Sequence, residues 1–148
     1  MSEKNYDPRM HSAEHILNQT MVQMFGCKRS MNSHIERKKS KCDYILKEQP
    51  TTTQITEIEN KVNSIIQSNL NVNIEFVAKE AASQFLDLSK LPQDAPETLR
   101  VVRIGSYDAC ACIGPHVSNT SEIGQFQIIS TDFSNGVIRI RFKLAGVE

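Results

Sequence analysis

Two pairs of soft metal ligands constrain this fold most, because they lie far apart along the chain. The first pair is His11 and His15, in the stretch HSAEH, and the second is Cys112 and His116, in the stretch CIGPH. Thiolate and imidazole are the ligands that zinc prefers, and zinc typically takes four in a tetrahedron. One shared zinc site would require the chain to bring these segments together. The alternative is a structural Cys112 and a buried, hydrogen-bonded His116.

The local sequence favours convergence within each pair. Residues 8–25 carry apolar side chains at three- and four-residue steps, which predicts a helix over Pro8–Phe25. Asp7 before Pro8 is a plausible helix start, and Gly26 is a plausible stop. Histidines four residues apart then lie on one face of that helix. In the second pair, Gly114-Pro115 favours a turn that would return Cys112 and His116 to one point.

The remaining patterns predict an α+β fold, with an antiparallel sheet and two longer helices packed on it. A second apolar stripe predicts a helix over Thr51–Asn69, and a short helix is expected over Lys79–Leu86. The expected strands are Ser30–Ile35, Cys42–Leu46, Asn71–Val77, Leu99–Ile104 and a hairpin of Ile123–Ser130 with Gly136–Leu144. Leu91–Thr98 is expected to be a loop. One domain spanning residues 1–148 is the simplest organisation.

Charge and composition limit the possible partners. Lys+Arg and Asp+Glu both number 17, so bulk charge does not indicate nucleic-acid binding, and an anionic partner would need a local patch. A basic run offers one candidate, although such runs are commonly solvated turns: Arg37, Lys38, Lys39 and Lys41. No apolar run is long enough to cross a membrane, and the start has no signal-peptide core, so we expect a cytoplasmic protein. In that compartment Cys27 and Cys42 are expected to be small buried hydrophobes.

Several motifs together resemble those of a known family. The stretches HSAEHIL at 11–17, CIGPHV at 112–117 and SNTSEIGQF at 118–126 carry the resemblance, supported by KKSKCDY at 38–44, IENKVNSIIQSNLNVNIE at 58–75 and RVVRIGSYDA at 100–109. They are similar to the editing domain of alanyl-tRNA synthetase and the second additional domain of threonyl-tRNA synthetase. At this length the chain looks most like AlaX, the free-standing trans-editing proteins. The Gly-Pro-His wording is of the threonyl type, whereas the alanyl type usually has Gly-Thr-His.

The resemblance implies zinc-dependent hydrolysis of mischarged aminoacyl-tRNA in trans, with Ser- or Gly-charged tRNA for alanine as the expected substrate. It assigns the zinc ligands to His11, His15, Cys112 and His116. If all four bind at once the site is closed, so we expect His116 to be labile and to act as a general base, with His11 as the second catalytic candidate. Substrate contacts or ligand orientation are expected from Ser12, Ser30, Asp108 and Cys110.

The tRNA is expected to contact the basic run and the polar face of the last strand, which carries Arg139, Arg141 and Lys143. Two other functions remain open at this point. The chain would be a non-catalytic tRNA- or aminoacyl-binding module if it had kept the fold and lost the chemistry. It would be a zinc hydrolase of another small ester or amide if the metal site served a different substrate.

Overall fold

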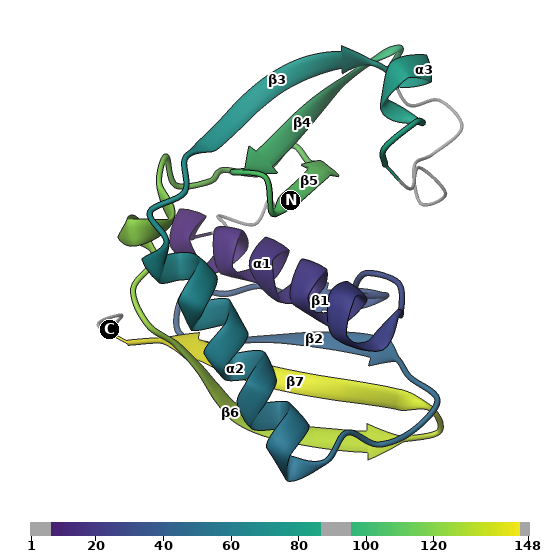
Figure 1. Ribbon diagram of the computed structural model, residues 1–148, viewed down its shortest axis with the longest axis vertical. Coiled ribbons are helices and arrows are strands. Elements are labelled where there is room, and N and C mark those ends of the chain that lie inside the picture. Colours follow the sequence, from purple (N-terminus) through teal and green to yellow (C-terminus); the bar gives the residue numbers. More distant parts are fainter. Residues whose placement is uncertain (1–6, 87–95, 146–148) are drawn as a thin grey trace.

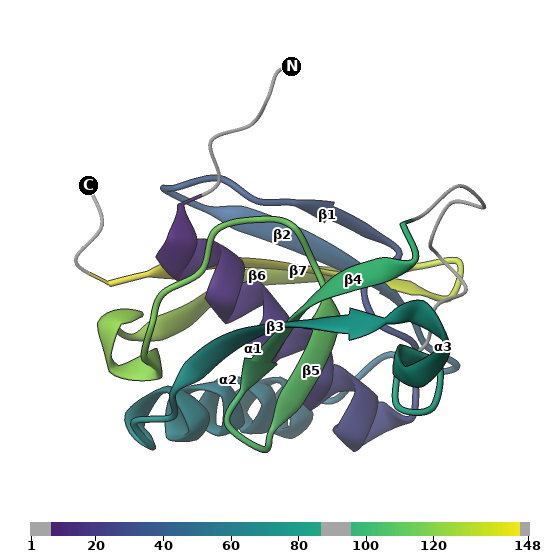
Figure 2. The ribbon, with the colours of Figure 1, turned by 90° about the horizontal axis from the view of Figure 1, so that it is seen from above.

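The computed structural model describes residues 7–86 and 96–145, and it shows two antiparallel sheets on either side of a long helix. The larger sheet has the order β1-β2-β7-β6, and the smaller has the order β3-β4-β5. In Figure 1, helix α1 lies between the two sheets, and α2 lies beside α1 on the larger sheet. Figure 2 shows the smaller sheet crossing over α1. The α+β class is therefore confirmed, but the strands form two sheets where one was expected.

The helices follow the predicted apolar stripes. Helix α1 spans Pro8–Phe25, as predicted, with Asp7 as its N-cap and Gly26 in a left-handed conformation after its end. Helix α2 spans Thr52–Gln67 and begins with a capping box between Thr51 and Gln54. The third helix, α3, spans only Lys79–Ala82, because the chain then continues in turns through residue 86.

The larger sheet gathers strands from both ends of the sequence: β1 (Asn32–His34), β2 (Ser40–Ile45), β6 (Phe126–Ser134) and β7 (Val137–Leu144). Strands β6 and β7 form the predicted hairpin around Asn135 and Gly136, both with positive φ. The predicted alternation along β7 is confirmed, since Ile138, Ile140, Phe142 and Leu144 are buried. They pack into the main core together with the apolar face of α1.

The smaller sheet consists of β3 (Val72–Ala78), β4 (Thr98–Ile104) and β5 (Asp108–Ala111). Strand β5 was not predicted separately; it has only four residues and leads into the Cys112 motif. Of the expected loop at Leu91–Thr98, residues 91–95 lie outside the described part, and Thr98 opens β4. No helix in the described part of the chain is long and apolar enough to cross a membrane.

Candidate metal centre

Helix α1 carries the first half of the site on its buried face. The Asp7 carboxylate accepts hydrogen bonds from the backbone of Arg9 and Met10, which fixes the start of the helix just before the first histidine. His11 and His15, one turn apart, are both buried, with T-shaped rings whose centroids lie 5.0 Å apart. The helix thus holds two imidazoles toward the smaller sheet.

The segment after β5 carries the second half. Arg100 of β4 fixes this segment, because its Nη1 donates to the carbonyls of Cys112 at 2.8 Å and Gly114 at 2.9 Å. The two halves are also joined directly. The Oγ of Ser12 lies 2.9 Å from His116 Nδ1 and accepts a hydrogen bond from the backbone N–H of Val117 at 3.2 Å.

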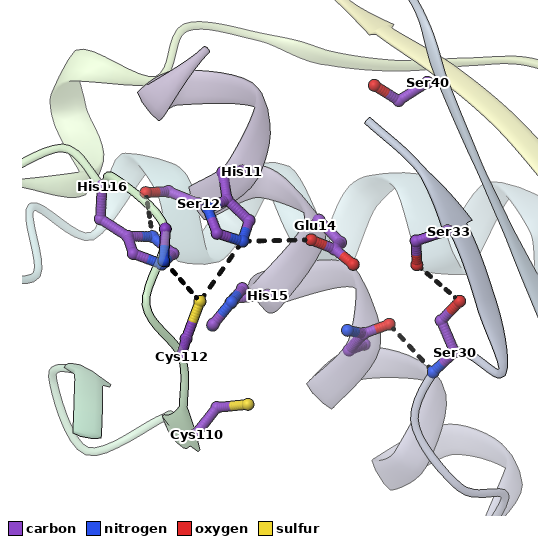
Figure 3. A network of polar contacts seen from close by, with 12 residues as sticks. His11, Ser12, Glu14, His15, Ser30, Ser33, Ser40, Cys110, Cys112 and His116 are labelled. Atoms are coloured by element: carbon purple, nitrogen blue, oxygen red, sulfur yellow. Dashed lines mark hydrogen bonds and ion pairs between the residues drawn. The ribbon is translucent and has the colours of Figure 1, made fainter. Parts of the chain in front are cut away.

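The four predicted ligands meet at one point. The ligand atoms of His11, His15, Cys112 and His116 all lie within 4.8 Å of one another, and this group could hold a metal ion. In Figure 3 the sulfur of Cys112 points toward the ring of His11, and its Sγ lies 3.4 Å from His11 Nε2. Among the described residues, His116 Nε2 is buried and has no hydrogen-bond partner. A buried nitrogen of this kind is expected to have a ligand.

Gly114 allows the loop to approach His11 this closely. A Cβ added at residue 114 would lie 2.2 Å from Cε1 and 2.5 Å from Nδ1 of the His11 ring. The same His11 Nδ1 lies 3.1 Å from the carbonyl oxygen of Pro115, so the ring is fixed by the turn itself. Gly114 is therefore required by packing against a ligand, in addition to its place in the turn.

The electrostatics favour the metal-binding protonation state at Cys112 and His116 but not at His15. Burial lowers the pKa of His15, but the neighbouring Asp108 and Cys112 outweigh this and raise it to about 9, so a metal ion would have to displace a proton from this ring. Burial alone would raise the pKa of the Cys112 thiol, but the neighbouring rings of His11, His116 and His15 lower it to about 3. Burial lowers the pKa of His116 to about 4. A thiolate and a neutral imidazole are the forms that bind a metal ion. The donor set therefore fits a zinc ion by residue type and convergence.

A buried carboxylate supports His15 from behind. Asp108 Oδ2 lies 3.6 Å from His15 Nδ1. Arg29 donates to both oxygens of Asp108, with Nη1 at 2.7 Å from Oδ1 and Nη2 at 3.3 Å from Oδ2. Burial raises the pKa of Asp108, but the neighbouring His15 ring and the Arg29 guanidinium outweigh this and lower it. Carboxylate–histidine–metal arrangements of this kind fix the orientation of the ligand.

The other expected substrate residues have mixed positions. Ser12 and Asp108 are buried behind the candidate ligands: Ser12 is hydrogen-bonded to His116, and Asp108 lies within ion-pair distance of His15. Cys110 is half-buried, and burial raises the pKa of its thiol to about 11. The Ser30 hydroxyl lies farther away and contacts Ser33 at 2.8 Å.

The expected cationic residues belong to the larger sheet and to its β1–β2 turn, where Arg37 Nε lies 3.9 Å from Oδ2 of Asp7, the N-cap of α1. Arg37, Lys38 and Lys39 are exposed in the turn between β1 and β2. Arg139 and Arg141 each have a carboxylate partner, Asp43 at 2.8 Å and Asp132 at 2.7 Å respectively. Lys41 lies beside Arg141 in the β2–β7 pairing, and Lys143 is exposed.

Sequence reasoning missed three residues at the site. Glu14 places Oε1 at 3.6 Å from His11 Nε2, at the edge of the cluster. Its position three residues after His11 on one helix was a usable signal. The contact of Gly114 with His11 and the pairing of Arg29 with Asp108 had no such signal, because both join segments distant in sequence.

Comparison with known proteins agrees with the motifs. Residues 99–141 match the family described as threonyl and alanyl tRNA synthetase second additional domain. Alanine–tRNA ligases are similar over most of the chain: that of Hyperthermus butylicus is 31% identical over 95% of this chain and 16% of its own length. The enzyme of Blochmanniella floridana is 35% identical over 88% of this chain and 15% of its own length. The enzyme of Methanococcus maripaludis is 31% identical over 90% of this chain and 16% of its own length. The chain thus spans about a sixth of these relatives. The resemblance inferred from the motifs is confirmed.

Proposed function

The chain is an editing-domain-like relative of the alanyl-tRNA synthetases, and we propose that it is a zinc-dependent deacylase that hydrolyses mischarged aminoacyl-tRNA in trans. The observation that carries the proposal is the convergence of four ligand atoms within 4.8 Å from two distant segments. The regions that match this chain are parts of alanine–tRNA ligases, and this supports an aminoacyl ester on tRNA as the substrate class. We expect the protein to act in the cytoplasm.

Zinc would be held by His11, His15 and Cys112, with His116 as a fourth, exchangeable ligand. When bound there, zinc would supply Lewis-acid polarisation of an ester carbonyl and would lower the pKa of a water molecule to about 7. Asp108 would fix the orientation of His15, as its position behind that ring suggests.

His116 is the proposed proton acceptor. Its Nδ1 is held by the Ser12 hydroxyl at 2.9 Å, which leaves Nε2 as the nitrogen that faces the cluster. Its pKa, lowered to about 4, keeps the ring neutral and able to accept a proton. Glu14, at the edge of the cluster beside His11, is placed to bind the ammonium group of the aminoacyl substrate. The exposed turn at Arg37, Lys38 and Lys39 is the proposed phosphate contact for tRNA.

A deacylation panel tests the function. The purified protein is incubated with tRNA for alanine charged with Ser, Gly or Ala, and with tRNA for threonine charged with Ser, with and without a chelator. We expect release of Ser or Gly from tRNA for alanine and loss of release after chelation. Lack of release from every tRNA, with metal bound, would contradict the proposal and favour a binding module or a hydrolase of another ester.

The variant His116→Ala separates the two roles of that residue. Metal content and deacylation are measured on the same preparation. Retained zinc with lost activity supports the base, whereas lost zinc shows that His116 is needed as a ligand and removes the base assignment.

A further inference from the structure

A row of three side chains crosses the smaller sheet and ends at the metal centre. Phe76 on β3 is paired with Arg100 on β4. The backbone N–H of Cys112 donates to the carbonyl of Arg100 at 3.0 Å, so Cys112 continues the row beyond the end of β5. Directly paired residues of antiparallel strands lie on the same face of a sheet. Phe76 therefore shares a face with the ligand Cys112.

That face is buried near α1 and exposed at its edge. Val102 and Ile104 of β4 lie on it and belong to the main core. On the edge strand β3, however, Phe76 is 71% exposed, and its neighbour Ile74 is 47% exposed. Glu75, between them, lies on the opposite face and pairs with Arg103. The free end of the row thus presents apolar side chains with no carboxylate of β3 beside them, while the guanidinium of Arg100, in the middle of the row, is directed toward the ligand loop.

The spacing fits one nucleoside. Neighbouring strands lie about 4.8 Å apart, so the backbones at Phe76 and Cys112, two strands apart, are separated by about 10 Å. An ester carbonyl at the metal centre is attached to the terminal ribose, and the nucleobase of that ribose lies about one nucleoside length away. Exposed aromatic rings bind unpaired bases at RNA ends by stacking, and a cation nearby favours the adjoining phosphate.

We propose that Phe76, flanked by Ile74, binds the terminal nucleobase of the RNA whose ribose ester is hydrolysed at the metal centre. The proposal rests on the function proposed above and adds the residue that positions the end of the substrate. Arg100 connects the two parts of the site, because its guanidinium holds the carbonyls of Cys112 and Gly114. A substrate base placed on Phe76 is thereby kept in register with the ligand loop.

The test compares Phe76→Ala, Phe76→Trp and the control Phe85→Ala. Phe85 is also an exposed phenylalanine, 44% exposed, but its ring contacts Arg103, which lies on the opposite face of the sheet. Two substrates are used: a mischarged RNA stem ending in adenosine, and the same RNA with an abasic terminal ribose. Stacking of a base on an aromatic side chain corresponds to about 5- to 150-fold in affinity.

For the adenosine-ended RNA we expect Phe76→Ala to lower kcat/KM by about 5- to 150-fold, mainly through KM. We expect Phe76→Trp and Phe85→Ala to have the kcat/KM of the wild type on this RNA. For the abasic RNA, the wild type and Phe76→Ala should have equal kcat/KM values. Equal kcat/KM values for the wild type and Phe76→Ala on the adenosine-ended RNA would overturn the proposal. An equal loss on both substrates would also overturn it, because it would show a structural role for Phe76.

A binding measurement separates this inference from the proposed function. An RNA stem whose terminal ribose carries the amino acid through an amide is bound without turnover. Weaker binding by Phe76→Ala than by Phe85→Ala supports the base contact even if no ester is released by the wild type, in which case only the hydrolytic function fails. Light scattering is the remaining control: a wild-type dimer that Phe76→Ala converts to monomer would assign this face to a second copy and overturn the proposal.

Discussion

Replacing Gly114 by alanine tests whether the close approach of the loop to His11 is needed for metal binding. The added Cβ would lie 2.2 Å from Cε1 of His11, whereas carbon atoms in contact are normally about 3.5–4.0 Å apart. One of the two groups must therefore move by more than about 1 Å, which exceeds the roughly 0.5 Å tolerance of a functional site. The ring cannot move freely, because its Nδ1 is bonded to Pro115.

We expect Gly114→Ala to weaken metal affinity by about 10- to 100-fold, the usual effect of misplacing a ligand. Overpacking should also lower the free energy of unfolding by about 1–3 kcal/mol. Competition with a chromogenic chelator measures the affinity, and chemical denaturation measures the stability. The control is Ile113→Ala, because Ile113 is the preceding residue and is 92% exposed. This variant should change neither the metal affinity nor the free energy of unfolding. Wild-type metal affinity in Gly114→Ala would refute the reasoning.

Two further predictions concern the buried carboxylates of Asp108 and Asp43. Asp108→Asn should lower metal affinity by about 10- to 100-fold, because His15 loses a charged partner. The chelator titration measures this affinity. Unchanged affinity would show that Arg29 and Asp108 serve only packing. The hydrogen bonds and charge of Arg139 lower the pKa of Asp43 below its ordinary 3.8. The contribution of Asp43 to the free energy of unfolding is therefore complete above pH 3.8 and is lost as pH falls below it. We expect the unfolding free energy of Asp43→Asn to fall less than that of the wild type as pH is lowered toward about pH 3. Parallel pH profiles of the two proteins would contradict this.

The parts of the site that could be predicted from sequence depend on local geometry. His11 and His15 share a helix face because a helix repeats every 3.6 residues, and the apolar stripe of α1 identified that helix. The Gly-Pro turn likewise suggested how Cys112 and His116 return to one point. The convergence of the two pairs on one point was inferred only from ligand chemistry and the resemblance, because nothing local relates residues so far apart.

The rest depends on which segments become neighbours in space. The periodic patterns of β2 and β7 indicate a buried face for each strand, but they do not specify a partner, so the division into two sheets was not predicted. The same holds for the guanidinium of Arg29, which reaches Asp108 from the segment after α1. Arg139 and Arg141 were expected to face RNA, and the carboxylates beside them, Asp43 on β2 and Asp132 on β6, became visible only with the registers of the β2–β7 and β6–β7 pairings.

The distance in sequence between the two halves of the metal centre has a consequence for the order of events during synthesis. Helix α1 is made first, yet its two imidazoles have no thiolate beside them until the ribosome has released the loop after β5. A nascent chain therefore passes through a long interval in which the first helix offers only a weak bidentate site. Tight binding of a metal ion by this group would therefore come late, after strands β3, β4 and β5 have brought the loop onto the helix.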